Sequence, residues 1–258
     1  MSDLYIFHGI DSKVGTTMIS QSVAELMAEA FPEKKVIFMA LNGRESTDFV
    51  REDTEYIDTL KSRLESRMLA ENELAAHCRN IRNMFVLGGI CNEDEERYYQ
   101  PELASHLIDV AAGQFDIIVI DSGNRLDNGL AFGALRLSGD KFFIMTQQES
   151  ILARWEKRKP VYERLGILPS GYILNRYMDK DIYPLDYIAK RLEMDKGKFH
   201  KVSFSGSGRR AEIERKTLMA NPGDAFPSDI ARFVKRALGI DLDGIGGIKR
   251  KRRWKNFI

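Results

Sequence analysis

The stretch H-G-I-D-S-K-V-G-T-T-M-I-S, residues 8–20, decides the fold of this chain. An apolar run at residues 4–7 precedes it, and Ile19, Val23 and Leu26 follow at helical spacing. A buried strand, a turn of small residues and a helix start, in this order, form the frame of a P-loop, whose backbone N–H groups surround phosphates. The sequence therefore predicts a strand–loop–helix unit with the shape of a phosphate site.

The loop keeps this shape but lacks the usual charges. With Gly15 as its last glycine, Thr16 stands where a P-loop has its phosphate-binding lysine, and Thr17 supplies the hydroxyl that holds Mg²⁺. Lys13 lies in the same loop and is a candidate substitute cation. Two interpretations stay open: a weak nucleotide site, or a relic whose turn is retained because the fold needs it.

Length and composition indicate one large core. The chain has 258 residues, of which 43% are hydrophobic and 30% charged, as expected for an α/β domain at 1–240 with a tail at 241–258. Cys78 and Cys91 fit neither a disulfide framework nor a metal cluster, which indicates a reducing cytosol. We expect no signal peptide and no membrane span, and hence a cytoplasmic protein.

Strands and helices alternate along the chain. We expect strands at about 4–8, 36–41, 84–87, 115–120, 141–145, 172–174 and 201–204, and helices at about 16–31, 101–112, 149–165 and 228–237; a polar stretch also has helical spacing at Ile57, Leu60, Leu64 and Met68. This alternation predicts an α/β fold with a single doubly wound, mainly parallel sheet and helices on both faces. The acidic segment 91–100 reads as a solvated surface insertion.

Polar residues stand where several of these strands end, which is where doubly wound sheets bind ligands. Asp121 ends an apolar strand, in the setting of a Walker B aspartate that holds Mg²⁺ through water, or else of a turn or cap residue. Asn42 follows the second strand, and Asn175-Arg176 follows the sixth. His8 also lies near the loop, and strand-end packing is its expected role.

Together these features resemble the MinD/ParA family of deviant Walker ATPases, over residues 4–238. The family's loop, KGGVGKTT, falls on D-S-K-V-G-T-T-M, its Walker B strand on FDIIVIDS, and its adenine-contacting strand end on GYILNR. The resemblance implies binding of ATP and Mg²⁺, with Thr17 and, through water, Asp121 at the metal. It implies cofactor contacts from Asp11, Ser12, Lys13, Val14, Gly15, Thr16, Thr17, Met18, Asn175 and Arg176.

Three positions depart from the family pattern. Asp11 replaces the signature lysine that in the family reaches the phosphates of the dimer partner, Thr16 replaces the phosphate-binding lysine, and Asn42 replaces the aspartate that positions the attacking water. Because phosphoryl transfer depends mainly on electrostatic stabilisation, we expect ATP hydrolysis to be slow or absent. The alternative is an active, surface-cycling ATPase for cell division or segregation, with Lys13 replacing the lost lysines.

Within the superfamily, the strings SKVGTTMIS and LNGRE are similar to the TadZ/CpaE branch, whose members localise the machinery of tight-adherence pili. This resemblance implies a homodimer that recruits a pilus or secretion assembly. TadZ and CpaE proteins often carry an N-terminal receiver-like domain, and we expect none in this chain.

The C-terminal segment is strongly basic. The last ten residues hold six Lys/Arg and no acids, so residues 1–248, with 33 basic and 38 acidic residues, carry a net charge of −5. Six cations and an apolar tip are typical of an anchor on an anionic inner membrane face; a solvated tail and a DNA-binding arm of a partition protein are the alternatives. The proposed membrane tail comprises Lys249, Arg250, Lys251, Arg252, Arg253, Trp254, Lys255, Phe257 and Ile258.

Overall fold

A single sheet forms the centre of the molecule. The computed structural model describes residues 2–50, 54–70, 72–240 and 242, and the sheet that it shows has eight strands. Their order is β3-β4-β2-β5-β1-β6-β7-β8, and every neighbouring pair is parallel except β3 and β4. The strands are β1 (Asp3–Gly9), β2 (Val36–Ala40), β3 (Arg79–Ile81), β4 (Met84–Leu87), β5 (Ile117–Asp121), β6 (Asp140–Met145), β7 (Gly171–Tyr177) and β8 (Phe199–Ser203).

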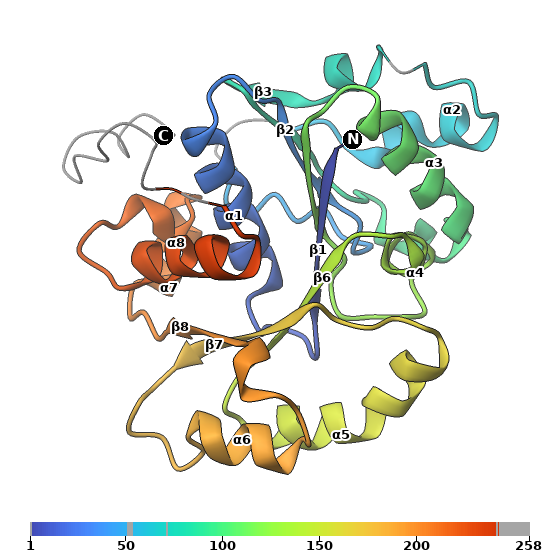
Figure 1. Ribbon diagram of the computed structural model, residues 1–258. Helices are drawn as coiled ribbons and strands as arrows, with labels where there is room; N and C mark the ends of the chain where they lie inside the picture. The colour runs from blue at the N-terminus through green and yellow to red at the C-terminus, as the bar shows by residue number, and fades with distance from the viewer. Residues whose placement is uncertain (1, 51–53, 71, 241, 243–258) are drawn as a thin grey trace.

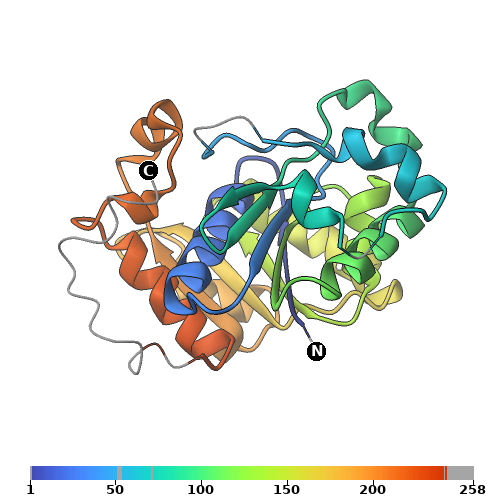
Figure 2. The same cartoon turned by 90° about the horizontal axis from the view of Figure 1, so that it is seen from above.

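Helices cover both faces of this sheet. Figure 1 shows α1 and α8 on one side and α3, α4 and α5 on the other, and Figure 2 again places α8 beside α1. The α-helices are α1 (Thr16–Ala30), α2 (Lys61–Glu65), α3 (Pro101–Ala112), α4 (Gly129–Arg136), α5 (Glu149–Arg164), α6 (Leu185–Arg191), α7 (Gly208–Glu214) and α8 (Phe226–Ala237). Short 3-10 helices occur at Ile57–Leu60, Leu74–His77, Glu93–Tyr98, Lys196–Lys198 and Leu218–Ala220.

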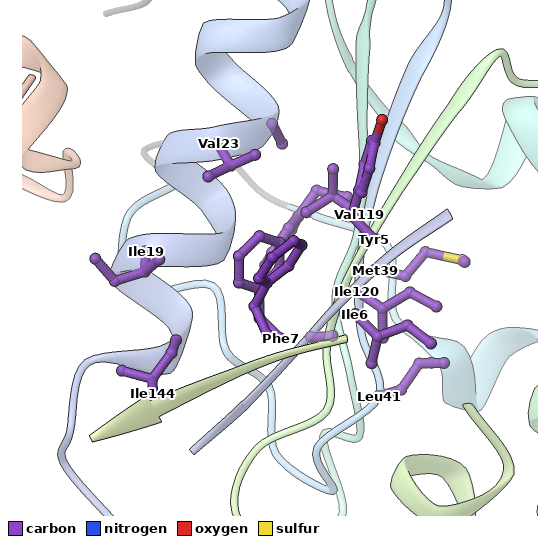
Figure 3. Packing of buried hydrophobic residues seen from close by; sticks show 14 of the residues in the cluster. Tyr5, Ile6, Phe7, Ile19, Val23, Met39, Leu41, Val119, Ile120 and Ile144 are labelled. Atoms are coloured by element: carbon purple, nitrogen blue, oxygen red, sulfur yellow. The ribbon is translucent and has the colours of Figure 1, made fainter. Parts of the chain in front are cut away.

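The core lies on both faces of the central strands. Figure 3 shows Ile19 and Val23 of α1 facing the ring of Phe7 on β1, while Ile6 projects from the opposite face. All of these side chains are fully buried, as expected for a strand covered by helices on both sides. This packing fixes the end of β1, and with it the loop at residues 10–15.

The predicted fold class is confirmed, and the differences are local. The expected strands and helices are present, but the antiparallel strand β3 and helices α4, α6 and α7 were not anticipated. The strand predicted at 172–174 runs from Gly171 to Tyr177, so Asn175 and Arg176 lie within it and not after it. The ladder with β8 is irregular between Leu174 and Tyr177, where Arg176 has a left-handed φ of 54°.

The predicted surface insertion at 91–100 is ordered into a 3-10 helix. None of the residues Glu93–Tyr98 is buried, but the following Tyr99 is, and its hydroxyl donates to Asp58 Oδ1 at 2.7 Å. Within the described part of the chain no helix is long and apolar enough to cross a bilayer. The predicted membrane tail, 249–258, lies outside the described residues.

Candidate functional site

A hydroxyl and a carboxylate meet beneath the loop. Thr17, in the first turn of α1, donates from Oγ1 to Oδ2 of Asp121 at 2.6 Å, and Asn42 Nδ2 donates to the same oxygen at 3.0 Å. The backbone N–H of Gly123 donates to Oδ1 at 2.9 Å. The sequence prediction that Thr17, Asn42 and Asp121 belong to one site is consistent with this geometry, because parallel strands place their carboxyl ends at one edge.

Asp121 is a buried acid held by neutral donors. Its side chain is 0% exposed, and burial raises the pKa of the carboxyl, while the hydrogen bonds from Thr17, Gly123 and Asn42 act in the opposite direction. Threonine hydroxyl and carboxylate oxygens are the hard ligands that Mg²⁺ takes. The pair therefore fits a magnesium site in which Thr17 and Asp121 would hold the ion.

The loop above this pair presents backbone donors. Gly15 caps α1 in the left-handed conformation, at φ 94°, and no side chain caps the helix. Within the described residues, the backbone N–H groups of 13–18 have no recorded acceptor. An uncapped helix start with open backbone amides is a ready anion site, so these amides fit the phosphates of a nucleotide.

Asn175 clamps the loop. Its Nδ2 donates to the Val14 carbonyl at 2.8 Å, its Oδ1 accepts from the backbone N–H of Arg176, and its side chain is 5% exposed. A Cβ atom at Gly15 would lie 2.4 Å from Asn175 Nδ2, so the loop and this amide are in direct contact. The amide predicted to contact adenine is thus engaged with the loop itself.

Asp11 turns toward α5. Its Oδ1 accepts from the backbone N–H of Ser12 at 2.7 Å and from Arg154 Nη1 at 2.9 Å. Four residues further along α5, Arg158 donates from Nη1 to the carbonyls of Ile10 and Asn124, each at 3.2 Å. Two arginines from a distant helix therefore lie against the loop, and the sequence analysis did not identify either of them.

The remaining loop residues divide between core and surface. Val14, Thr16 and Met18 are buried, and Thr16 Oγ1 would be 2.5 Å from a Cβ at Gly9, so this hydroxyl packs against the end of β1. Ser12 and Lys13 are exposed, Lys13 with a left-handed φ of 58°. In the described residues no partner is recorded for the Lys13 ammonium, and its role as a substitute cation stays a prediction.

His8 supports the loop that follows β5. It is 0% exposed; Nδ1 lies 3.0 Å from Ser122 Oγ and Nε2 lies 2.7 Å from Tyr162 Oη. Because Ser122 Oγ donates its proton to the Phe7 carbonyl, Nδ1 carries the imidazole proton and Nε2 accepts from Tyr162. Burial lowers the pKa of His8 to about 3, so the ring is neutral. The predicted strand-end packing is confirmed.

The acidic segment also reaches the edge of the site. Glu96 accepts at Oε1 from Asn128 Nδ2 at 2.8 Å and at Oε2 from Arg125 Nη1 at 3.3 Å. A Cβ at Gly43 would lie 2.6 Å from the Glu96 carboxylate, so Gly43 permits this close approach. Glu96 thereby links the loops after β2 and β5, both of which flank Asp121.

Comparison with solved structures gives the same architecture. A ParA family ATPase from Chlorobium tepidum superposes with a TM-score of 0.79 at 16% identity, over 93% of this chain and 100% of that one. The septum site-determining protein MinD of Pyrococcus horikoshii, complexed with Mg-ADP, superposes with a TM-score of 0.62 at 18% identity, over 98% of this chain and 100% of that one. A chain of the MinC:MinD cell division protein complex of Aquifex aeolicus superposes with a TM-score of 0.70 at 12% identity, over 93% of this chain and 97% of that one.

No protein-family model and no curated protein matches the sequence. The structural matches establish the fold, that of the MinD/ParA-type P-loop NTPases.

Proposed function

We propose that this chain is a MinD/ParA-like positioning protein that binds ATP and Mg²⁺ weakly and hydrolyses ATP slowly or not at all. The observation that carries the proposal is the Thr17–Asp121 pair at 2.6 Å beneath a loop whose backbone amides are open. Bound nucleotide would place Mg²⁺ at Thr17 and Asp121 and phosphates at the amides of residues 13–18. The Mg-ADP complex of the P. horikoshii protein supports this choice of ligand.

The proposed lack of turnover follows from which residues are present. Thr16 is buried against Gly9 and has no cationic group, and Asn42 gives Asp121 a hydrogen bond where a catalytic acid is expected. Stabilisation of transferring phosphate requires preorganised positive charge close to it, whereas the two arginines at the loop, Arg154 and Arg158, are engaged by Asp11 and by backbone carbonyls. Binding without efficient chemistry is therefore the function that this site supports best.

Nucleotide binding and turnover test the proposal together. ATP affinity is measured by calorimetry with and without Mg²⁺ for the wild type and Thr17→Val, which keeps the shape and removes the hydroxyl. We expect Mg²⁺ to tighten binding to the wild type about tenfold and to change the variant little, from the loss of one charge-assisted ligand. If ATP binding depended equally on Mg²⁺ in both proteins, Thr17 would not be a ligand of Mg²⁺.

Steady-state ATP turnover distinguishes the proposed positioning protein, with slow or absent hydrolysis, from the alternative active ATPase. We expect a rate indistinguishable from that of Asp121→Ala. A clear rate that disappears in Lys13→Ala would establish the active, surface-cycling enzyme with Lys13 as its cation. Lys157→Ala is the matched control, because Lys157 is also exposed and lies on α5 outside the loop.

We further propose that the protein acts as a homodimer that localises a pilus or secretion assembly, in the manner of the TadZ/CpaE branch. The loop string SKVGTTMIS and the turn LNGRE support this assignment. The MinC:MinD complex shows that a protein of this fold assembles with a partner. A fluorescent fusion is expected to form fixed foci in cells, and loss of the protein to disperse the pilus machinery; wild-type pilus placement in its absence would refute this role.

The basic tail is the proposed contact with the inner membrane face, at which the cytoplasmic protein would be peripheral. Six cations near an anionic leaflet are worth several kcal/mol, at roughly 1 kcal/mol for each, and apolar insertion adds to this. Co-sedimentation with vesicles of 30% phosphatidylglycerol is compared for the full chain and a variant ending at Gly247, with duplex DNA as competitor. Retention of binding after truncation, or preference for DNA, would overturn the membrane proposal.

A further inference from the structure

Helix α5 presents two arginines to the candidate site. Arg154 and Arg158 are four residues apart, so they share one face of the helix. Arg154 pairs with Asp11 in the loop, and Arg158 bridges the carbonyls of Ile10 and Asn124, which belong to the two loops flanking the site. A helix 143 residues further along the chain thus brings two positive charges to the loop.

Asp11 accepts hydrogen bonds from groups that could equally bind another anion. One carboxylate oxygen, Oδ1, takes both the backbone N–H of Ser12 and the guanidinium of Arg154. Backbone amides together with an arginine form the usual donor set for a phosphate oxygen. The Asp11 carboxylate therefore behaves as a resident anion at the edge of the loop.

We propose that Arg154 is a phosphate-binding residue of this site, and that Asp11 is the counter-ion that an incoming phosphate displaces from it. Arg158 is a positioning residue, whose guanidinium holds the loop and the segment after β5 together. This inference rests on the proposed nucleotide site and assigns its missing cation. It also gives the reversed charge at Asp11 a role, namely lowering the affinity of the loop for anions.

The Arg154–Asp11 ion pair is exposed enough for a phosphate to replace the Asp11 carboxylate. The Arg154 side chain is 45% exposed and that of Asp11 is 15% exposed. Ion pairs this close to solvent contribute little, so a polyphosphate with several charges can outcompete a single carboxylate. Arg158 is less exposed and, in the described part of the chain, forms no ion pair, which suits a fixed charge more than an exchangeable one.

The test measures binding of inorganic triphosphate and of ATP, without Mg²⁺, by calorimetry. The variants are Arg154→Ala, Asp11→Asn and the double variant, with Lys157→Ala as control for loss of one charge on the same helix. We expect Arg154→Ala to weaken binding about fivefold and Asp11→Asn to tighten it about fivefold, as for one partly exposed charge contact. Lys157→Ala is expected to stay within twofold, and thermal unfolding midpoints confirm that each variant is folded.

The double variant separates displacement from simple repulsion. If Asp11 acts by occupying Arg154, then Asp11→Asn gives less than a twofold gain once Arg154 is absent. An equal gain in both backgrounds, or unchanged binding in Arg154→Ala, would overturn the inference while leaving an ATP site intact. Triphosphate binding with these effects but no preference for ATP would instead refute the proposed function alone. Absence of binding to both wild type and Asp11→Asn would refute both.

Discussion

Substitution of Gly15 by alanine tests the contact between the loop and β7. Gly15 has φ 94°, and its added Cβ would lie 2.4 Å from Asn175 Nδ2. The left-handed conformation costs an alanine about 1 kcal/mol. Displacing Asn175 breaks its 2.8 Å bond to the buried Val14 carbonyl, which adds about 1 to 3 kcal/mol. We therefore expect Gly15→Ala to lower the free energy of unfolding by about 2 to 4 kcal/mol.

Two control glycines separate these contributions. Gly166 also has a positive φ, 69°, but no atom lies within 4 Å of its Cβ position, so Gly166→Ala isolates the backbone cost of about 1 kcal/mol. Gly206 has neither feature, and Gly206→Ala is expected to be nearly neutral. Urea unfolding followed by circular dichroism gives all three values under one condition.

A double-mutant cycle with Asn175→Ala decides whether the clash is the cause. Removing the amide opens the space beside Gly15, so Gly15→Ala in that background should cost only the backbone contribution of about 1 kcal/mol. The two substitutions are then non-additive by about 1 to 3 kcal/mol. Additivity within 0.5 kcal/mol would refute the assignment of Asn175 as a clamp on the loop.

Three further substitutions probe polar side chains of the core and the site through the free energy of unfolding. His8 has a native pKa of about 3 against 6.5 when unfolded, so its contribution to stability should fall by about 2 kcal/mol between pH 7 and 5. The difference in the free energy of unfolding between the wild type and His8→Gln should change by that amount, and a difference independent of pH would refute this. Burial raises the pKa of Glu25, on α1, to about 7, against 4.5 when unfolded. The native state therefore binds more protons, and the contribution of Glu25 to stability should fall by about 2 to 3 kcal/mol as pH rises from 4.5 to 7. The difference between the wild type and Glu25→Gln should change by that amount, and a difference that stays constant with pH would contradict it. Without Mg²⁺, Asn42→Asp should lower the free energy of unfolding by about 1 to 3 kcal/mol, because a second carboxylate would replace a hydrogen-bond donor to the buried Asp121. A variant as stable as the wild type would contradict this prediction.

Local patterns predicted the centre of the site. The apolar run before residue 8, the small residues of the loop and the helical spacing after it identified the strand, turn and helix, and thereby Thr17. Asp121 was found because it ends the most apolar strand, and parallel topology brings that end beside the loop. These inferences depend on neighbours in sequence and on general sheet geometry, which a sequence displays directly.

The contacts from α5 had no such signal. Arg154 and Arg158 stand in a helix with many charged residues, a composition typical of a solvated surface, and their partners are 143 and 148 residues away. Their spacing of four residues indicates a shared face but not what that face meets. Only the tertiary arrangement, with α5 packed beside the loop, turns them into site residues.

Helix α4 was missed for a different reason. Its sequence, GLAFGALR, contains two glycines, which lower helix propensity. In the structure, Cβ atoms at Gly129 and Gly133 would lie 1.9 Å and 2.1 Å from the carbonyl oxygens of Tyr99 and Pro101. These glycines permit close packing of α4 against the start of α3, so tertiary contact outweighs the local preference.

Two of the departures from the MinD/ParA loop pattern, Asn42 and Asp11, have a common electrostatic consequence. Asn42 donates to the buried Asp121 carboxylate, and Arg154 pairs with Asp11, so each acid near the loop has a partner within the chain. A P-loop with two lysines has positive charge that a nucleotide must neutralise, and binding is correspondingly tight. At the proposed site a nucleotide would have to displace internal partners before it gained its own contacts. In the proposed function, weak binding and slow chemistry would be two results of one charge arrangement, and such a protein would depend on a partner or a surface, more than on ATP turnover, to set where it assembles.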